Sequence, residues 1–185
     1  MSTTHATRIT DDLVLPHLAP EALDRLVSVT GGAVNVGLTI LHHPALAVRY
    51  QPFGLSFLTD GILPAREREL TILRTSWHCR SPYEWAHHTK IGRACGISDE
   101  EFRRITTSDL SGWPRPDAEL LDAVDAVVRD HSLSEAQWAN LSGRYGTAGA
   151  IETVMLAGHY AMLAGVLNSA GTRIEPGIEA PVPLN

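Results

Sequence analysis

A serine–proline step at residues 81 and 82 divides two stretches that both have the composition of α-helices. Residues 64–77, before the step, are rich in strong helix formers and place apolar side chains on one stripe. Proline disfavours helical geometry in the residue before it, so this first helix must end before Pro82. Proline suits the first turn of a new helix, and Ser81 followed by Glu84 has the spacing of a capping box. The sequence therefore predicts a helix, a sharp break and a second helix that ends at Gly96.

Helical signals recur along the rest of the chain, and no segment has a convincing strand pattern. Residues 44–58 read as a helix in which Pro52 and Gly54 predict a kink or a break. Residues 147–168 are apolar on nearly every side, which predicts a helix surrounded by the rest of the protein. Other helical segments begin near Pro20, Asn35, Ser98, Ala118 and Leu133. With eight or nine such signals, the sequence predicts an all-α fold of about eight helices.

The length of 185 residues is sufficient for one domain with a single hydrophobic core. Residues 1–18 are polar and are expected to form a flexible N-terminal arm. Residues 19–172 are expected to form one all-α domain, followed by an extended, proline-rich tail over residues 173–185. The composition, 44% hydrophobic and 19% charged, is ordinary for a globular protein, so disorder is not expected in the body of the chain.

The charge pattern restricts the class of partner. The formal net charge is −6, and no basic stripe is present that would replace phosphate counterions, so a nucleic-acid partner is not expected. A small molecule or another protein is the expected partner.

Cysteine usage and apolar runs indicate the compartment. Cys79 and Cys95 fit neither a CxxC redox pair nor a zinc knuckle, which favours a reduced, cytoplasmic setting. The first residues lack a basic region followed by an apolar one, so no secretory signal is predicted. Residues 148–167 approach the length of a membrane span, but Glu152 and His159 interrupt them. A buried core helix is therefore predicted there, and no membrane association.

Three side chains around the break have the types needed for proton transfer. Glu84 and His88 are four residues apart and share one face of the second predicted helix. A partly buried carboxylate–imidazole pair shifts both pKa values toward neutrality, where general acid–base catalysis is most effective. Glu69 lies beside the apolar stripe of the preceding helix, toward the edge of the core. We expect His88 to be the general base or acid, Glu84 its proton partner, and Glu69 the group that orients His88 or serves as a second acid.

Each of these residues also has a structural explanation. A capping box accounts for Ser81 and Glu84 without any substrate, and Glu69 is placed to pair with Arg66 three residues before it. His88 alone is more often an ordinary helix histidine than a catalyst. For each of these residues the sequence therefore leaves both a catalytic and a structural role open.

Further polar and aromatic residues are candidates for substrate contacts. The expected substrate-binding residues are Ser81, Tyr83, His87, Trp85 and His159. For Tyr83 and Trp85, a role in packing is favoured over a role in substrate contact. His159 belongs to the apolar final helix together with Glu152 and Asn168, and such polar groups need a buried partner or a cavity.

Neither a metal nor a cofactor is expected. The region of the break supplies suitable ligand types in Glu69, His78, Glu84, His87 and His88. Their spacing matches no H-E-x-x-H arrangement, however, and adjacent histidines on a helix point in different directions.

The residues RERELTILRTSWHCRSPYEWAHHTKIGRACGIS, at 66–98, resemble the core motif of the carboxymuconolactone decarboxylase and alkylhydroperoxidase D-like superfamily. Residues 41–67 and 156–171 are also similar to its subgroup with a YEWxxHxxxGRAAG-like signature, so the resemblance covers roughly residues 35–170. It implies an alkylhydroperoxidase D-like helical bundle that assembles into a homo-oligomer, a trimer or a hexamer.

One departure from the superfamily bears on the reaction. Its peroxidase branch has a glutamate, eleven residues, then C-x-x-C-x-x-x-H, whereas this chain has Glu69, eleven residues, then Ser81-x-x-Glu84-x-x-x-His88. A disulfide relay needs an attacking and a resolving thiol, and Cys79 lies two residues too early. The remaining residues resemble the decarboxylase branch, which implies a cofactor-independent enzyme acting on a small carbonyl, carboxylate or lactone compound.

Two alternatives stay open. The first is a thiol peroxidase that uses Cys79 or Cys95. The second is a non-catalytic small-molecule-binding protein, which predicts a Glu84 occupied by its capping box and no open cavity at His88.

Overall fold

The computed structural model describes residues 35–178, which form seven α-helices and no β-strand within that range. The helices are α2 (Asn35–Leu41), α3 (Pro44–Thr59), α4 (Ala65–His78), α5 (Pro82–Ala94), α6 (Asp99–Ile105), α7 (Arg115–Asp130) and α8 (Glu135–Ala170). The predicted all-α fold is confirmed. The predicted arm, the helix start at Pro20 and the end of the tail lie outside the described residues, and the domain boundaries remain a prediction.

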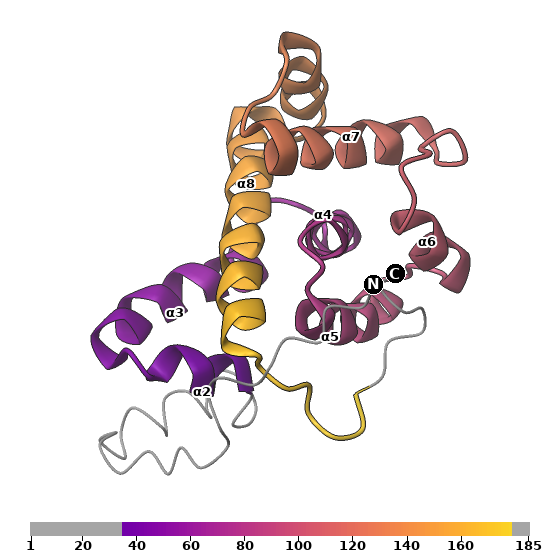
Figure 1. Cartoon of the computed structure of the whole chain (residues 1–185). Helices are drawn as coiled ribbons and strands as arrows, with labels where there is room; N and C mark the ends of the chain where they lie inside the picture. Colours follow the sequence, from indigo (N-terminus) through magenta and orange to yellow (C-terminus); the bar gives the residue numbers. More distant parts are fainter. Residues whose placement is uncertain (1–34, 179–185) are drawn as a thin grey trace.

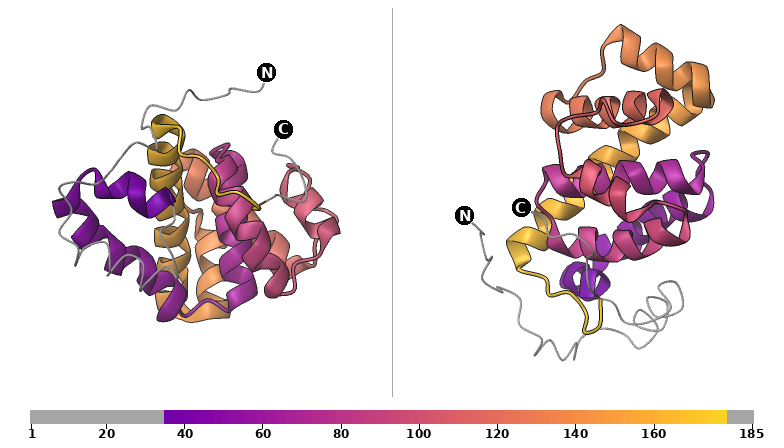
Figure 2. Two further views of the ribbon diagram at one scale, coloured as in Figure 1. Left: turned by 90° about the horizontal axis from the view of Figure 1, so that it is seen from below. Right: turned by 90° about the vertical axis from the view of Figure 1, so that its right-hand side faces the viewer.

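Helix α8 runs between two groups of helices (Figures 1 and 2). Helices α2 and α3 lie on one side of it, and α4 to α7 lie on the other (Figure 1). Helix α4 is central to the larger group, because it packs against α5, α7 and α8, and its residues 69–76 are all buried. The predicted break after α4 thus places the start of α5 beside the most deeply buried helix of the fold.

The apolar side chains of α4 face two hydrophobic clusters. Leu70 and Leu73 pack with Trp85 in the cluster formed with α5, α6 and α7. Ile72, on another face, packs with Leu156 in the cluster that extends toward α3 and α8. Helix α4 therefore joins both halves of the core, which explains why a helix with so many polar residues is buried.

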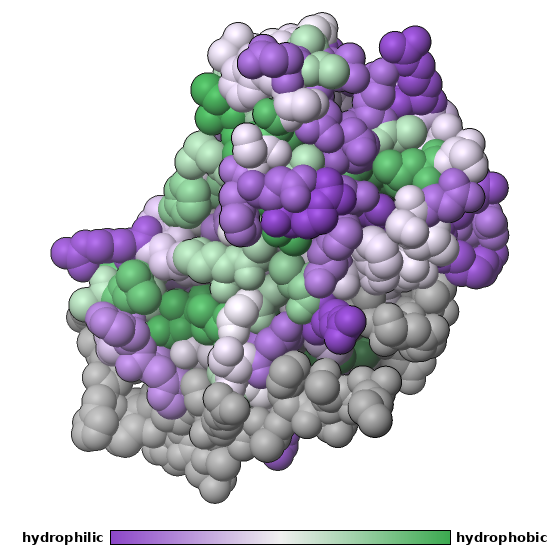
Figure 3. All heavy atoms as spheres, turned by 45° about the horizontal axis from the view of Figure 1, so that its top comes forward, coloured by the Kyte–Doolittle hydropathy of each residue, from purple (hydrophilic) through white to green (hydrophobic). Residues whose placement is uncertain are grey.

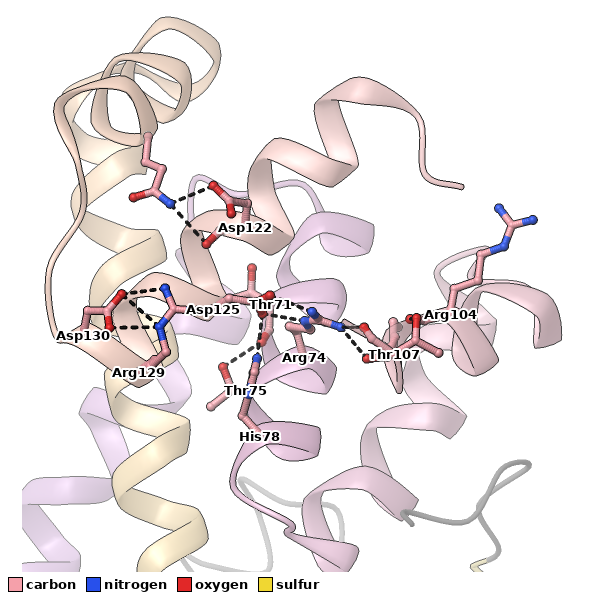
Figure 4. Close-up of polar contacts among 12 residues, drawn as sticks. Thr71, Arg74, Thr75, His78, Arg104, Thr107, Asp122, Asp125, Arg129 and Asp130 are labelled. Carbon is pink, nitrogen blue, oxygen red and sulfur yellow. Dashed lines mark hydrogen bonds and ion pairs between the residues drawn. The ribbon is translucent and has the colours of Figure 1, made fainter. Parts of the chain in front are cut away.

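A buried ion pair connects α4 to α7 (Figure 4). The guanidinium of Arg74, which is fully buried, donates to both carboxylate oxygens of Asp125 at 2.5 and 2.6 Å. It also donates to the carbonyl oxygens of Ile105 and Thr107 at 2.7 and 2.5 Å, and His78 lies 2.7 Å from Asp125. Because a buried charge is costly unless it is paired and hydrogen-bonded, this network is a structural requirement of α4.

The chain turns sharply between α4 and α5, as the sequence predicts. Arg80 has a φ of 49°, in the left-handed region, and the Ser81 N–H donates to the carbonyl oxygen of Ser76 at 2.9 Å. From α8, the Asn168 amide donates to the carbonyl oxygen of Cys79 at 2.9 Å. These bonds satisfy backbone groups that the helix end would otherwise leave unpaired.

The predicted capping box at the start of α5 is wrong. The Ser81 side chain makes no capping hydrogen bond, whereas Ser98 and Ser134 form complete capping boxes at the starts of α6 and α8. The difference is burial: Ser81 and Glu84 are 0% and 2% exposed, so both side chains lie inside the protein rather than around the helix end.

Helix α3 continues without interruption through Pro52 and Gly54, so the predicted break does not occur. A proline inside a helix removes one backbone hydrogen bond, and packing of α3 against α2 and α8 keeps the helix intact across it. The predicted helices over 133–146 and 147–168 form two arms of α8, joined at Gly146, whose φ of 72° and ψ of 170° are not helical.

The expectation that the final helix is surrounded is wrong for the single chain. Ile151, Met155, Met162 and Val166 are 46%, 45%, 52% and 43% exposed and follow one face of α8. Figure 3 shows apolar residues gathered on the side of the molecule formed by α3 and α8. Helix α8 is long and apolar enough to span a membrane, but half of its most apolar window is buried in the fold, as in a core helix.

Three polar residues within α8 contact polar groups of other segments. Glu152 accepts hydrogen bonds at 2.6 and 3.1 Å from backbone N–H groups of the α3–α4 connection. Asn168 binds the end of α4, as described above, and His159 lies 3.2 Å from the hydroxyl of Tyr50 on α3. The contacts of Glu152 and Asn168 are structural, whereas His159 lines a cavity described below.

Candidate functional site

Glu69 and His88 form a buried pair between α4 and α5. Nδ1 of His88 lies 2.7 Å from Oε2 of Glu69, and Nε of Arg68 donates to Oε1 of Glu69 at 3.1 Å. Glu69 is fully buried and His88 is 8% exposed. A Glu69 carboxylate holds the tautomer in which Nδ1 carries the proton, so Nε2 of His88 presents a lone pair, as a general base requires.

This pairing differs from two of the expectations from the sequence. The hydrogen-bond partner of His88 is Glu69 on the preceding helix, not Glu84 on its own helix. The alternative pairing of Glu69 with Arg66 is also wrong, because Arg66 binds carboxylates at the start of α6 and α7 instead. The expectation that Glu69 orients His88 matches the observed contact.

Glu84 is buried without a hydrogen-bond partner among the described residues. It is 2% exposed, and neither carboxyl oxygen has a hydrogen-bond partner among residues 35–178. Burial raises the pKa of Glu84 to about 8, and the nearby Ser81 hydroxyl, which lies outside hydrogen-bond geometry, opposes this rise only in part. Glu84 is therefore mostly protonated at neutral pH and able to act as a proton donor.

Tyr160 on α8 packs against His88. Its ring packs edge-to-face on His88, with 5.0 Å between ring centroids. Burial, followed by the negative potential of Glu69 and Glu84, raises the pKa of Tyr160 well above its usual value. Its hydroxyl therefore stays protonated. Sequence reasoning missed Tyr160, and its position directly after His159 in a buried helix was the one available signal.

A second polar group lies on the other side of Tyr160. The Tyr50 hydroxyl is 3.2 Å from Nε2 of His159, and the two rings are stacked with centroids 5.2 Å apart. Burial lowers the pKa of His159 to about 4, so its imidazole is neutral at physiological pH. Sequence reasoning identified His159 but not Tyr50, because nothing in the spacing along the chain relates α3 to α8.

A cavity of about 310 Å³ opens between α2, α3 and α8. Tyr50, His159 and Tyr160 lie along its wall, and most of the remaining lining is aliphatic. The cavity therefore adjoins the Glu69–His88 pair through the ring of Tyr160.

The other predicted substrate-binding residues lie in structural contacts. The Tyr83 hydroxyl donates to Glu175 at 2.7 Å, and Nε2 of His87 lies 2.5 Å from the same carboxylate. Trp85 is 1% exposed and packs edge-on against Phe102 in the core. Tyr83 and His87 thus fix the segment after α8, and of the five predicted contact residues only Ser81 and His159 lie near the groups described above.

The two cysteines are free thiols in different surroundings. Burial, together with the negative potential of Glu84, raises the pKa of Cys79 to about 11. Burial also raises the pKa of Cys95. Since the thiolate is the reactive form, neither cysteine has the environment of an activated nucleophile. Within the described range, no three His, Cys, Asp or Glu side chains converge on a geometry that would hold a metal ion.

Comparisons with known proteins agree with this architecture. Residues 44–121, which include α4, α5 and the Glu69–His88 pair, match the model of the Carboxymuconolactone decarboxylase family. The structure is similar to the crystal structure of an alkylhydroperoxidase AhpD core, an uncharacterized peroxidase-related protein from Ralstonia eutropha JMP134, with a TM-score of 0.78, 21% identity and 97% of each chain covered. Comparison with curated protein sequences gives no significant match. Residues 44–121 therefore resemble the Carboxymuconolactone decarboxylase family, and the fold of the described residues is alkylhydroperoxidase D-like.

Proposed function

We propose that this protein is a cofactor-independent acid–base enzyme, lyase or isomerase in type, acting on a small carbonyl compound. The observation that carries the proposal is the contrast between two buried carboxyl groups. Glu69 is paired with His88 and Arg68, whereas Glu84 has no partner among the described residues and its pKa is raised to about 8. Environments that separate two carboxyl groups in this way assign one to charge stabilisation and the other to proton donation.

The proposed reaction begins with proton transfer to His88. Nε2 of His88 removes a proton from the carbon next to the substrate carbonyl, and the electron pair moves onto the carbonyl oxygen to give an enolate. Glu69 stabilises the imidazolium that forms on His88, and the carboxyl proton of Glu84 is transferred to the enolate oxygen. Return of the proton from His88 to a different carbon gives isomerisation, and departure of a leaving group from the carbon beyond the enolate gives elimination. Decarboxylation would enter the same path at the enolate, which forms when CO2 leaves a β-keto acid and is then protonated at carbon.

Hydrogen exchange tests the proposal without knowledge of the natural substrate. Small ketones, lactones and keto acids are incubated with the enzyme in deuterium oxide, and loss of the proton next to the carbonyl is followed by NMR. Exchange is expected with the wild type and is expected to fall by roughly 100-fold or more in His88→Ala and Glu84→Gln. Control variants are His42→Ala and Glu135→Gln, since both positions are exposed and lie outside the site. Full exchange in His88→Ala would rule out the proposed role.

The alternative function is a thiol peroxidase, because the similar crystal structure is that of a peroxidase-related protein. The raised pKa of Cys79 disfavours it, and the positions of the paired cysteines are held by Ser81 and Glu84. Peroxide consumption with a dithiol donor, lost on Cys79→Ser, would support this alternative. Equal consumption in Cys79→Ser would exclude a role for that thiol.

We further propose that the protein works in the cytoplasm on a small molecule, as a homo-oligomer, with no nucleic-acid or membrane partner. The exposed apolar face of α8 supports assembly, because a regular row of large apolar side chains at 43–52% exposure is a suitable helix-packing surface. The expectation of a trimer or hexamer comes from the superfamily.

A further inference from the structure

The cavity between α2, α3 and α8 is lined partly by aliphatic and partly by polar side chains. Its aliphatic part comes from all three helices and includes Ile40, Leu55 and Leu163. Its polar part consists of Tyr50, Gln51, His159 and Tyr160, and among the described residues no lysine, arginine, aspartate or glutamate lines it. Apolar walls with a few convergent polar groups are typical of small-molecule sites.

The imidazole of His159 is held in a fixed position at this wall. Its ring stacks on Tyr50 and contacts Phe53, Phe57 and Tyr160, with ring centroids 5.2 to 5.5 Å apart. A Cβ on Gly54 would lie 3.2 Å from Cε1 and 3.3 Å from Nε2 of this ring, so the absence of a side chain at Gly54 permits the arrangement. Nδ1 of His159 is buried and has no hydrogen-bond partner among the described residues. Such a group indicates a missing partner, because an unsatisfied buried polar atom is costly.

The electrostatics of the cavity disfavour an anion. Burial keeps His159 neutral and raises the pKa of Tyr50, with a further contribution from the negative potential of Glu84. The same potential, with that of Glu69, acts on Tyr160. A carboxylate bound here would lose its hydration and would meet no lysine or arginine among the described residues that line the cavity.

We propose that this cavity is a binding site for a neutral, largely apolar molecule with one ring and one carbonyl or hydroxyl oxygen, placed against Tyr50, His159 and Tyr160. Size supports a single ring, because an apolar cavity of ~150 Å³ holds benzene and this one leaves room for substituents. None of Glu69, Glu84 and His88 lines the cavity, so binding of this molecule is independent of turnover at the acid–base site. The proposal restricts the ligands of this cavity to uncharged molecules.

Benzamide and benzoate provide a matched pair of probes, nearly equal in shape and different in charge. Binding is measured by calorimetry and by the NMR shifts of the imidazole nitrogens of ¹⁵N-histidine-labelled protein, with His159 assigned from the His159→Phe spectrum. Benzamide is expected to bind at least tenfold more tightly than benzoate and to shift the His159 signals. Equal or tighter binding of benzoate, or unchanged His159 signals, would overturn the proposal.

Glycine substitutions test the position of the site. Gly54→Ala places a methyl group against the His159 ring and is expected to weaken benzamide binding at least fivefold. Gly143→Ala is the matched control, since it is also a helical glycine and its added Cβ meets no atom within 4 Å. Equal affinities in both variants, with folding verified by circular dichroism, would place the site elsewhere.

The two proposals fail in different ways. If Glu84→Gln and His88→Ala bind benzamide normally but wild-type protein exchanges no substrate proton, the cavity assignment stands and the enzymatic function fails. If a carboxylate is turned over in a manner that depends on Glu84 while benzamide does not bind, the function stands and the neutral-ligand assignment fails.

Discussion

Nδ1 of His88 and Oε2 of Glu69 are 2.7 Å apart, although the two residues are 19 positions apart and lie on different helices. The turn at Arg80 and Ser81 brings α5 back along α4 and creates this contact. Glu69 is fully buried, so its bond to His88 fixes both the position and the tautomer of the ring. In the proposed mechanism Glu69 is thus a positioning residue that acts through His88.

The first prediction concerns this contact. Glu69→Gln keeps the shape of the side chain but lets an amide face His88, which favours the tautomer with the proton on Nε2. We expect kcat to fall by ~100-fold or more with little change in KM. The ¹⁵N spectrum of His88 is expected to show the tautomer change, whereas Glu135→Gln leaves both kinetics and spectrum unchanged. A kcat near that of wild type with an altered tautomer would contradict the account.

The second prediction concerns stability and pH. Glu84 has an ordinary pKa of 4.5, and burial raises its pKa to about 8 in the folded protein. Between these values the folded state binds more protons than the unfolded state, so the contribution of Glu84 to stability falls as pH rises. The free energy of unfolding of Glu84→Gln, relative to wild type, is expected to rise by a few kcal/mol between pH 5 and pH 9. Urea titrations measure it, and a difference that is constant with pH would contradict the raised pKa.

The third prediction concerns the ion pair between α4 and α7. Asp125→Ala leaves the guanidinium of Arg74 buried without its carboxylate, which is expected to cost ~3–5 kcal/mol of stability. Arg129→Ala, which breaks an ion pair at the surface of the same helix, is the control and is expected to leave the urea midpoint unchanged. Similar midpoints for both variants would show that Arg74 finds other compensation.

The fourth prediction concerns the segment after α8. Glu175 accepts bonds from the backbone N–H of Asn35 at 2.6 Å and from the Tyr83 hydroxyl at 2.7 Å, and lies 2.5 Å from His87. Glu175→Ala is expected to raise amide hydrogen exchange around Asn35 and residues 172–178, without changing exchange in α7. Unchanged protection in the segment would mean that other contacts anchor it.

The fifth prediction concerns assembly. Met155→Glu and Met162→Glu place charges on the exposed apolar face of α8 and are expected to lower the mass of the particle measured by light scattering. Ala161→Glu is the control: it adds the same charge to α8 at a half-buried position that does not belong to this face, so particle mass is expected to stay unchanged. A wild-type protein that is monomeric at micromolar concentration would contradict the proposed assembly.

The sequence predicted most of the helices because their signals are local. Capping serines, prolines in first turns and a glycine after α5 act within one or two turns, so the break at Ser81 was predictable. The capping box at Ser81 failed because the same spacing serves two purposes, and only burial distinguishes them. The break predicted at Pro52 also failed, because packing against neighbouring helices keeps α3 helical through this proline.

Sequence patterns indicated several residues of the candidate site but not the contacts between them. Glu69, Glu84 and His88 were identified by residue type, but the choice of Glu69 as the partner of His88 depends on how α4 and α5 pack. Tyr50 and Tyr160 were missed, because their relation to His88 and His159 exists only after α3 and α8 come together. Residues brought together by tertiary packing leave no periodic signal along the chain.

The protonation state of Glu84 is the most direct test of the proposed chemistry. An infrared titration of wild type minus Glu84→Gln isolates the carbonyl stretch of this one carboxyl group. The account predicts a protonated carboxyl at pH 7 that titrates near pH 8. A carboxylate already ionised at pH 7, with a midpoint near the ordinary value of 4.5, would contradict it.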